Sequence, residues 1–154
     1  IAAGGFGNGE SLAAALMLGA DAIQVGTRFV VSKESNAHPN FKQAILKAKD
    51  LSTVVTGQIT GHPVRVLRNK LTHQYLELER RQTGVDHPDF SEMDQLATGA
   101  LRRAVVEGDT EGGSMMAGQV AGLITKEETV SEMIQDYIQV AKRTYEECQS
   151  VFVN

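Results

Sequence analysis

The sequence of 154 residues lacks the marks of several classes of protein. Cys148 is its only cysteine, which excludes an internal disulfide and a zinc site built from several thiolates. Lysine and arginine number 15 against 19 acidic residues, so the positive surplus that nucleic-acid binding uses is missing. No apolar run approaches the roughly 20 residues that cross a bilayer, and the first residues do not form a signal peptide. We therefore expect a cytoplasmic protein that binds neither nucleic acid nor a membrane, and no metal site.

The first half of the chain opens with a pattern that predicts part of a parallel βαβ unit. The first three residues, Ile1 to Ala3, read as the end of a buried strand. Residues 8–19 are apolar on nearly every side, with Asn8 placed to cap a helix and Gly19 placed to end it. Residues 22–25 have the length and bulk of an interior strand. Such a unit leaves apolar faces uncovered, so we expect a second polypeptide segment or a partner chain against it.

Downstream, the pattern changes from mixed α/β to mostly helical. A short helix is predicted after Pro39, followed by strands over residues 53–56 and 64–67. From there the apolar residues recur at helical spacing. This change in composition divides the chain into residues 1–68 and residues 69–154.

Three helices are predicted in the second part. Helical spacing begins at Leu71. A second helix is predicted over Ser91 to Gly108, with Asp94 completing an imperfect capping box. The last helix carries a long apolar stripe, and Thr125 with Glu128 predicts the capping box at its start.

Two glycine turns follow the two strands predicted near the start. Gly4-Gly5 comes after the first strand and Gly26-Thr27 after the second. In parallel α/β folds, ligands bind at the carboxyl ends of the strands. Glycine lets main-chain amides approach an anion closely, and Thr27 adds a hydroxyl donor. Because one strand-helix-strand unit separates the turns, they predict a shared phosphate site. The alternative is that these glycines only form tight turns.

Several longer motifs carry a resemblance to a known family. Three stand near the start, namely IAAGG from Ile1, GAD from Gly19 and QVGTRF from Gln24. Together they resemble the C-terminal part of the superfamily of FMN-dependent enoyl-acyl-carrier-protein reductases and nitronate monooxygenases, also called 2-nitropropane dioxygenases. Four later segments resemble the reductase branch: residues 34–39, 61–65, 69–72 and 112–119.

The resemblance implies a fold and a cofactor site. The fold would be α/β, the C-terminal part of a TIM (β/α)8 barrel that supplies the end of strand 7, strand 8 and a mostly helical subdomain. The N-terminal half of the barrel would come from the same or another chain. The family's catalytic histidine lies upstream of the matching region, so this segment alone is expected to be inactive. The residues implied to bind FMN are Ala3, Gly4, Gly5, Gln24, Gly26 and Thr27.

The segment 112–119 has two interpretations. Its small residues, with those that follow, would let a helix approach its neighbour closely. By resemblance, Ser114 and Met115 would instead line the substrate cleft, with Gln119 bonding nearby. Met115 and Met116 would then be adaptable apolar contacts for an acyl chain, whereas in the simpler interpretation the two methionines fill the core.

Three functions stay open from the sequence. The resemblance implies reduction of trans-2-enoyl thioesters of acyl carrier protein in fatty-acid synthesis, with FMN as cofactor and NADH or NADPH as reductant. The alternatives are oxidation of alkyl nitronates with FMN and dioxygen, and a non-enzymatic half barrel that binds a phosphate ligand. The oligomeric state is open, a homodimer included.

Two further features have a functional and a simpler interpretation. Arg65, Arg68 and Lys70 form a positive cluster that would suit an acidic acyl carrier protein, although ordinary ion pairing with acidic neighbours explains it more simply. His62, before Pro63, is either a catalytic histidine or a buried, hydrogen-bonded turn histidine, and the second interpretation is preferred.

Overall fold

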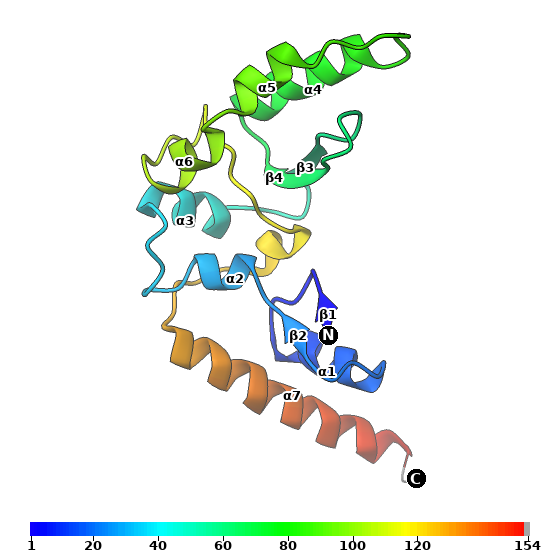
Figure 1. Ribbon diagram of the computed structural model, residues 1–154. Helices are drawn as coiled ribbons and strands as arrows, with labels where there is room; N and C mark the ends of the chain where they lie inside the picture. The colour runs from blue at the N-terminus through cyan, green and yellow to red at the C-terminus, as the bar shows by residue number, and fades with distance from the viewer. Residues whose placement is uncertain (153–154) are drawn as a thin grey trace.

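The chain opens with a parallel β-α-β unit (Figure 1). In the computed structural model, which describes residues 1–152, strand β1 (Ala2–Ala3) pairs in parallel with β2 (Ile23–Gln24). Helix α1 (Gly9–Met17) connects them, and the short helix α2 (Thr27–Val30) follows directly. The predicted order of strand, glycine turn, helix and strand is confirmed.

The ends of α1 are formed by the residues that the sequence predicts. The Asn8 side chain accepts a hydrogen bond from the Ser11 amide at 3.1 Å, and the Asn8 amide donates to the Ser11 hydroxyl at 3.3 Å. This reciprocal capping box satisfies amides that have no partner inside the helix. At the other end, Gly19 adopts a φ of 91°, the left-handed conformation that terminates many helices.

A β-hairpin forms the second sheet, and an extended segment is bridged to its edge. Helix α3 (Pro39–Leu46) leads into β3 (Thr53–Thr56), which pairs antiparallel with β4 (Val64–Leu67). On the other side of β4, the Leu67 amide donates to the Met115 carbonyl at 2.9 Å, and Met116 bridges to Val66. Residues 115–117 therefore run along the outer edge of β4 and contact it through an isolated bridge.

Three helices follow the hairpin, where the sequence predicted two. They are α4 (Lys70–Gln82), α5 (Ser91–Ala97) and α6 (Ala100–Val105). The prediction of one helix over 91–108 is wrong because Gly99 has a φ of 70° and breaks it. The predicted capping box at Ser91 is also wrong, since Phe90 is the cap residue of α5 and makes no side-chain cap bond.

The last two elements are the 3₁₀ helix η1 (Gln119–Leu123) and the long helix α7 (Val130–Phe152). The capping box of α7 lies four residues beyond the predicted one. Thr129 donates its amide to the Glu132 carboxylate at 2.7 Å, and the Glu132 amide donates to the Thr129 hydroxyl at 3.1 Å. Both pairs have the same spacing, and Glu128 is instead engaged by Arg28 at 3.1 Å.

One buried core joins the two predicted parts of the chain. Residues before position 69 contribute Val31, Phe41, Ile45 and Leu67 to it. The later residues of the same cluster are Ala104, Met115, Ala117, Val120, Ala121 and Ile124. The boundary at residue 68 stays a prediction, and this core packs across it.

At the end of the molecule that holds β1 and β2, α1 packs on α7, whereas α4 and α5 lie at the opposite end (Figure 1). A β-carbon built on Gly9 would lie 2.4 Å from the Val140 β-carbon, so the two helices are in close contact. No helix of residues 1–152 has the length and apolar character needed to span a bilayer.

Candidate functional site

The two glycine turns lie next to each other at one edge of the first sheet. In the register of β1 and β2, Ala3 is paired with Gln24, so both strands end at the same level. Gly4 and Gly5, with φ values of 93° and 85°, turn the chain after β1, and Gly26 does so after β2. Because the strands are parallel, both turns are at their carboxyl ends, where ligands bind in folds of this kind.

Open space surrounds these glycines. A β-carbon built on Gly4 or Gly5 would meet no atom within 4 Å. At Gly26 it would meet only the side-chain nitrogen Nε2 of Gln24, at 4.0 Å. The space beside these glycines is therefore unfilled, and the residues present fit a small anion such as a phosphate group.

Thr27 connects the second turn to the segment that precedes η1. Its hydroxyl oxygen accepts a hydrogen bond from the Gly118 amide at 2.9 Å. The side chain is only 9% exposed, and accepting this bond leaves the hydroxyl hydrogen available for a second partner. Thr27 therefore has the chemistry of the predicted donor, and its position is fixed by a residue 91 positions away.

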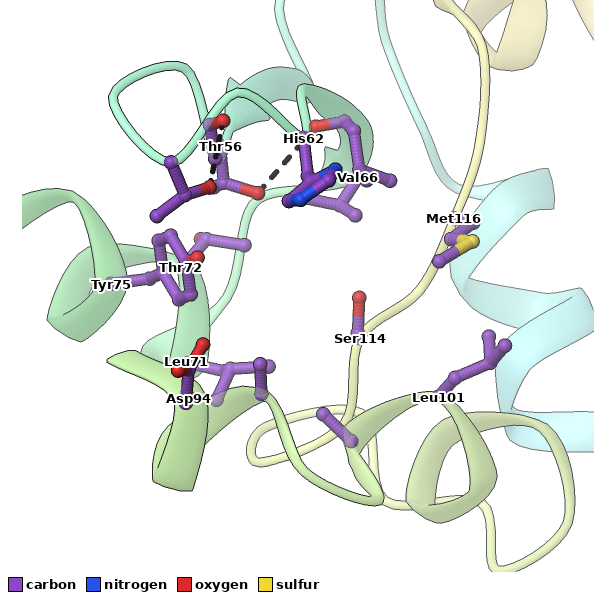
Figure 2. A pocket seen from close by; sticks show the side chains of 15 residues that line it. Thr56, His62, Val66, Leu71, Thr72, Tyr75, Asp94, Leu101, Ser114 and Met116 are labelled. Carbon is purple, nitrogen blue, oxygen red and sulfur yellow. Dashed lines mark hydrogen bonds between the residues drawn. The ribbon is translucent and has the colours of Figure 1, made fainter. Parts of the chain in front are cut away.

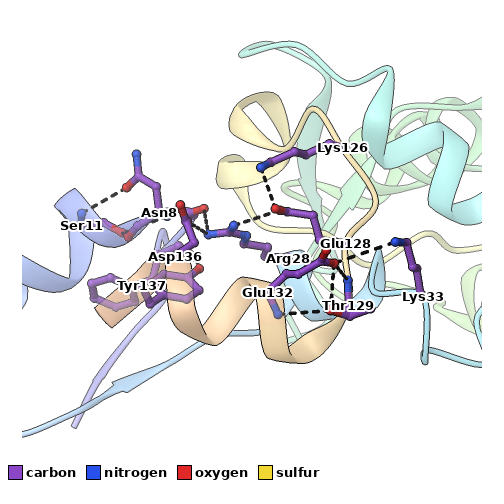
Figure 3. Close-up of polar contacts among 12 residues, drawn as sticks. Asn8, Ser11, Arg28, Lys33, Lys126, Glu128, Thr129, Glu132, Asp136 and Tyr137 are labelled. Carbon is purple, nitrogen blue, oxygen red and sulfur yellow. Dashed lines mark hydrogen bonds and ion pairs between the residues drawn. The ribbon is translucent and has the colours of Figure 1, made fainter. Parts of the chain in front are cut away.

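Arg28, the next residue, forms the most extensive polar cluster of the region (Figure 3). Its guanidinium donates to the Gly7 carbonyl at 3.0 Å, to Asp136 at 2.7 Å and to Glu128 at 3.1 Å. The Tyr137 ring lies 4.8 Å from the guanidinium carbon, a cation–π geometry. We refer to Arg28, Glu128, Asp136 and Tyr137 as the Arg28 cluster.

The charges of the Arg28 cluster hold the arginine in its ionised form. Burial by itself would lower the pKa of Arg28, but the hydrogen-bonded carboxylates of Asp136 and Glu128 raise it above its usual value. Burial also raises the pKa of Tyr137, whose hydroxyl donates to the Phe6 carbonyl at 2.9 Å. Both the cation and the phenol are therefore permanent donors near neutral pH.

A cavity of about 270 Å³ lies between the β3–β4 hairpin, α4, α5, α6 and the segment around Ser114 (Figure 2). Its walls are mainly apolar, with Val66, Leu71 and Leu101 among them. Tyr75 and Asp94 supply polar groups on one side, and burial raises the pKa of the Tyr75 phenol. Such a cavity suits an apolar ligand with a small polar part.

Comparison with known proteins identifies the family. The family model described as nitronate monooxygenase matches residues 1–139. This chain belongs to the nitronate monooxygenase family. A probable nitronate monooxygenase of Staphylococcus saprophyticus is 35% identical over 124 residues, covering 80% of this chain and 34% of that protein. The chain thus spans about a third of the length of the curated relatives it matches.

Solved structures extend the similarity over nearly the whole chain. FabK from Thermotoga maritima is 43% identical with a TM-score of 0.86, and the match covers 97% of this chain and 46% of FabK. A nitroalkane oxidase from Streptomyces ansochromogenes is 27% identical with a TM-score of 0.70, covering 95% of this chain and 40% of that protein. The non-enzymatic half barrel stays a prediction for a chain of this coverage.

In this family member, the predicted cleft residues separate into different environments. Ser114 lines the cavity. Met115 does not, because its side chain is 3% exposed and belongs to the core. Met116, 41% exposed, lines the cavity in its place. Side chains of an extended segment alternate between two faces, so positions 114 and 116 share one face and 115 takes the other.

Gln119 also lies outside the cavity, and its predicted role stays a prediction. It is exposed at the first position of η1 and is not part of the cavity wall. The close approach predicted for the small residues here does occur, because a β-carbon on Gly122 would lie 2.9 Å from the Asp50 amide. The element that makes it is a 3₁₀ turn, which carries Gln119 away from the cavity.

His62 and the basic cluster also take different environments from those expected. His62 is exposed at the cavity, and its amide rather than its ring is bonded, to the Gly57 carbonyl at 3.0 Å. Arg65 donates to the Thr53 hydroxyl at 3.1 Å and Arg68 to the Leu51 carbonyl at 3.2 Å. These two arginines thus bond to neutral oxygens, and docking of an acidic partner at this cluster stays a prediction.

Proposed function

We propose that this chain is the cofactor-phosphate and substrate-cavity part of an FMN-dependent enoyl-acyl-carrier-protein reductase of fatty-acid synthesis, with NADH or NADPH as reductant. The observation that carries the proposal is the pair of open glycine turns at the ends of two adjacent parallel strands, with Gly4, Gly5 and Gly26 facing unfilled space. The greater identity to FabK, 43% against 27% for the nitroalkane oxidase, favours the reductase.

The two parallel strands fit the last two strands of a (β/α)8 barrel. In such barrels, the loops after the final strands commonly bind phosphate. We place β1 and β2 as strands 7 and 8, with α1 as the helix between them. The remaining strands, and the catalytic histidine that the family resemblance implies, would come from the N-terminal half of the protein or from a partner chain.

The described residues would have two tasks. At the strand ends, the main chain of the glycine turns, Ala3 and Gln24 would bind the FMN phosphate, and the Thr27 hydroxyl would donate to it. FMN supplies the hydride chemistry when it is bound. In the cavity, apolar side chains together with Ser114 would hold the acyl part of the substrate, which acyl carrier protein delivers.

Oxidation of alkyl nitronates is the second candidate. The curated relatives are named as probable nitronate monooxygenases, and their identity of 33–35% falls between those of the two solved structures. The same glycine turns would bind the same cofactor in both reactions, so the phosphate site does not distinguish them.

Turnover by the full-length protein separates the two candidates. We expect NADH or NADPH to be oxidised only when crotonyl thioester is present. The assay excludes oxygen and monitors the absorbance of the reduced nicotinamide. A parallel assay follows oxygen uptake with an alkyl nitronate. Turnover of the nitronate alone would refute the reductase proposal, and a purified protein without flavin absorbance would refute both.

Filling the cavity is expected to discriminate between short and long acyl chains. Ala97 lines it from α5 and is exposed, so Ala97→Phe introduces a ring there without disturbing the core. The ring would exclude two methylene groups of a ten-carbon enoyl thioester from the cavity. Because burying each methylene contributes about 0.8 kcal/mol, we expect kcat/KM for this substrate to fall by about 10-fold. Ala97→Ser, which adds little volume, is the control, and crotonyl thioester should be unaffected by both. Equal losses for the two chain lengths would place the acyl chain elsewhere.

A further inference from the structure

The side chain of one buried cation links the two glycine turns. It follows the second turn in the sequence and bonds to the main chain that follows the first turn. Arg28 follows the Gly26-Thr27 turn directly. Its Nη1 donates at 3.0 Å to the carbonyl of Gly7, two residues beyond the Gly4-Gly5 turn. The distance between the two turns is therefore fixed by one side chain as well as by the two-residue strands.

Helix α7 holds this side chain in place. Asp136 accepts from the same Nη1 at 2.7 Å, and Glu128, just before the helix, accepts from Nη2 at 3.1 Å. The Tyr137 ring packs against the guanidinium at 4.8 Å, and its hydroxyl donates to Phe6 at 2.9 Å. Two consecutive carbonyls after the first turn, those of Phe6 and Gly7, are thus bound by donors that belong to the Arg28 cluster.

The charges in the cluster are balanced. Arg28 faces two carboxylates, and one of them, Glu128, also pairs with Lys126 at 2.6 Å. The Arg28 side chain is 6% exposed. Because its charge is neutralised in this way, the buried cation adds little net electric field at the strand ends. Its hydrogen bonds instead fix the positions of the segments that they join.

We propose that Arg28 is a positioning residue: together with Tyr137 it sets the spacing of the two glycine turns, and thereby determines how tightly the site binds the phosphate of the flavin. This inference rests on the proposed function, because it takes the phosphate of FMN as the ligand of the turns. In this proposal the Arg28 cluster affects how tightly the phosphate is bound, and it does not contact the flavin ring.

The test compares FMN with riboflavin, which lacks the phosphate, on the full-length protein stripped of flavin. Arg28→Lys keeps the charge but loses the forked donor geometry. We expect it to weaken FMN binding by about 10-fold, the effect of losing one charge-assisted hydrogen bond, and to leave riboflavin binding unchanged. Tyr137→Phe removes only the bond to Phe6 and should lower the ratio of the two affinities by about 3-fold.

Arg80→Lys is the matched control, because this arginine pairs with Glu77 on the exposed face of α4. Flavin fluorescence titrations give both affinities, and circular dichroism checks folding. Equal losses for FMN and riboflavin, or an unchanged ratio in Arg28→Lys and Tyr137→Phe, would overturn the positioning role. Should Arg28→Lys fail to fold, Tyr137→Phe alone decides the outcome. A wild-type protein that binds riboflavin as tightly as FMN would instead refute the phosphate site itself.

Discussion

Gly26→Asp is expected to weaken FMN binding by at least about 100-fold, because a carboxylate within several ångströms of a phosphate costs on the order of 3–4 kcal/mol at an effective dielectric constant of about 20. Gly26 is suited to this test. Its φ of −104° is accessible to any residue, and a β-carbon there meets only the side-chain nitrogen Nε2 of Gln24, at 4.0 Å. The substitution therefore adds charge without backbone strain or a steric clash.

Gly26→Asn is the control, since asparagine has nearly the same shape as aspartate and no charge. We expect it to weaken FMN binding by only about 3-fold. Titration of the flavin-free full-length protein at two salt concentrations gives both affinities, and salt should reduce the difference between them. If Gly26→Asp and Gly26→Asn bind FMN equally well, no anion lies at these strand ends and the proposed function loses its main support.

Gly9→Ala is expected to cause the largest loss of stability, about 3 kcal/mol of the free energy of unfolding. The added β-carbon would lie 2.4 Å from the Val140 β-carbon, 2.8 Å from the Ala141 amide and 2.9 Å from the Asp136 carbonyl. Two of these atoms belong to the backbone of α7, so no rotation of a side chain relieves the overlap and the helices must separate.

The measurement is the midpoint of urea unfolding of the full-length protein. Gly26→Ala serves as the control, because it makes the same chemical change in open space. Since Asp136 is a partner of Arg28, Gly9→Ala should also weaken FMN binding. An unchanged midpoint would show that α1 and α7 tolerate a wider separation than the structure has.

The local features of the fold could be predicted from sequence because short segments determine them. The capping residue Asn8, the terminating Gly19 and the glycine turns all act through atoms within a few positions. Where two segments carry the same capping pattern, the sequence alone does not predict which of them caps the helix. Thr125 with Glu128 and Thr129 with Glu132 have the same spacing, and the bond between Arg28 and Glu128 decides the outcome.

The rest depended on contacts between distant residues. The resemblance predicted Ser114 and Met115 in one cleft, whereas pairing with β4 makes this segment extended and places Met115 in the core. Reading residues 114–116 with a period of two would have separated them. No local signal indicated the Arg28 cluster, since its partners lie 100 and 108 positions further along the chain.

That long separation has a consequence for how the protein is made. Synthesis proceeds from the N-terminus, so both glycine turns leave the ribosome well before residues 128–137. Until α7 has been translated and has docked on α1, the Phe6 carbonyl lacks its donor Tyr137, and Arg28, the donor to the Gly7 carbonyl, lacks its carboxylate partners. The segment after the first glycine turn therefore reaches its final hydrogen bonding only once α7 has docked.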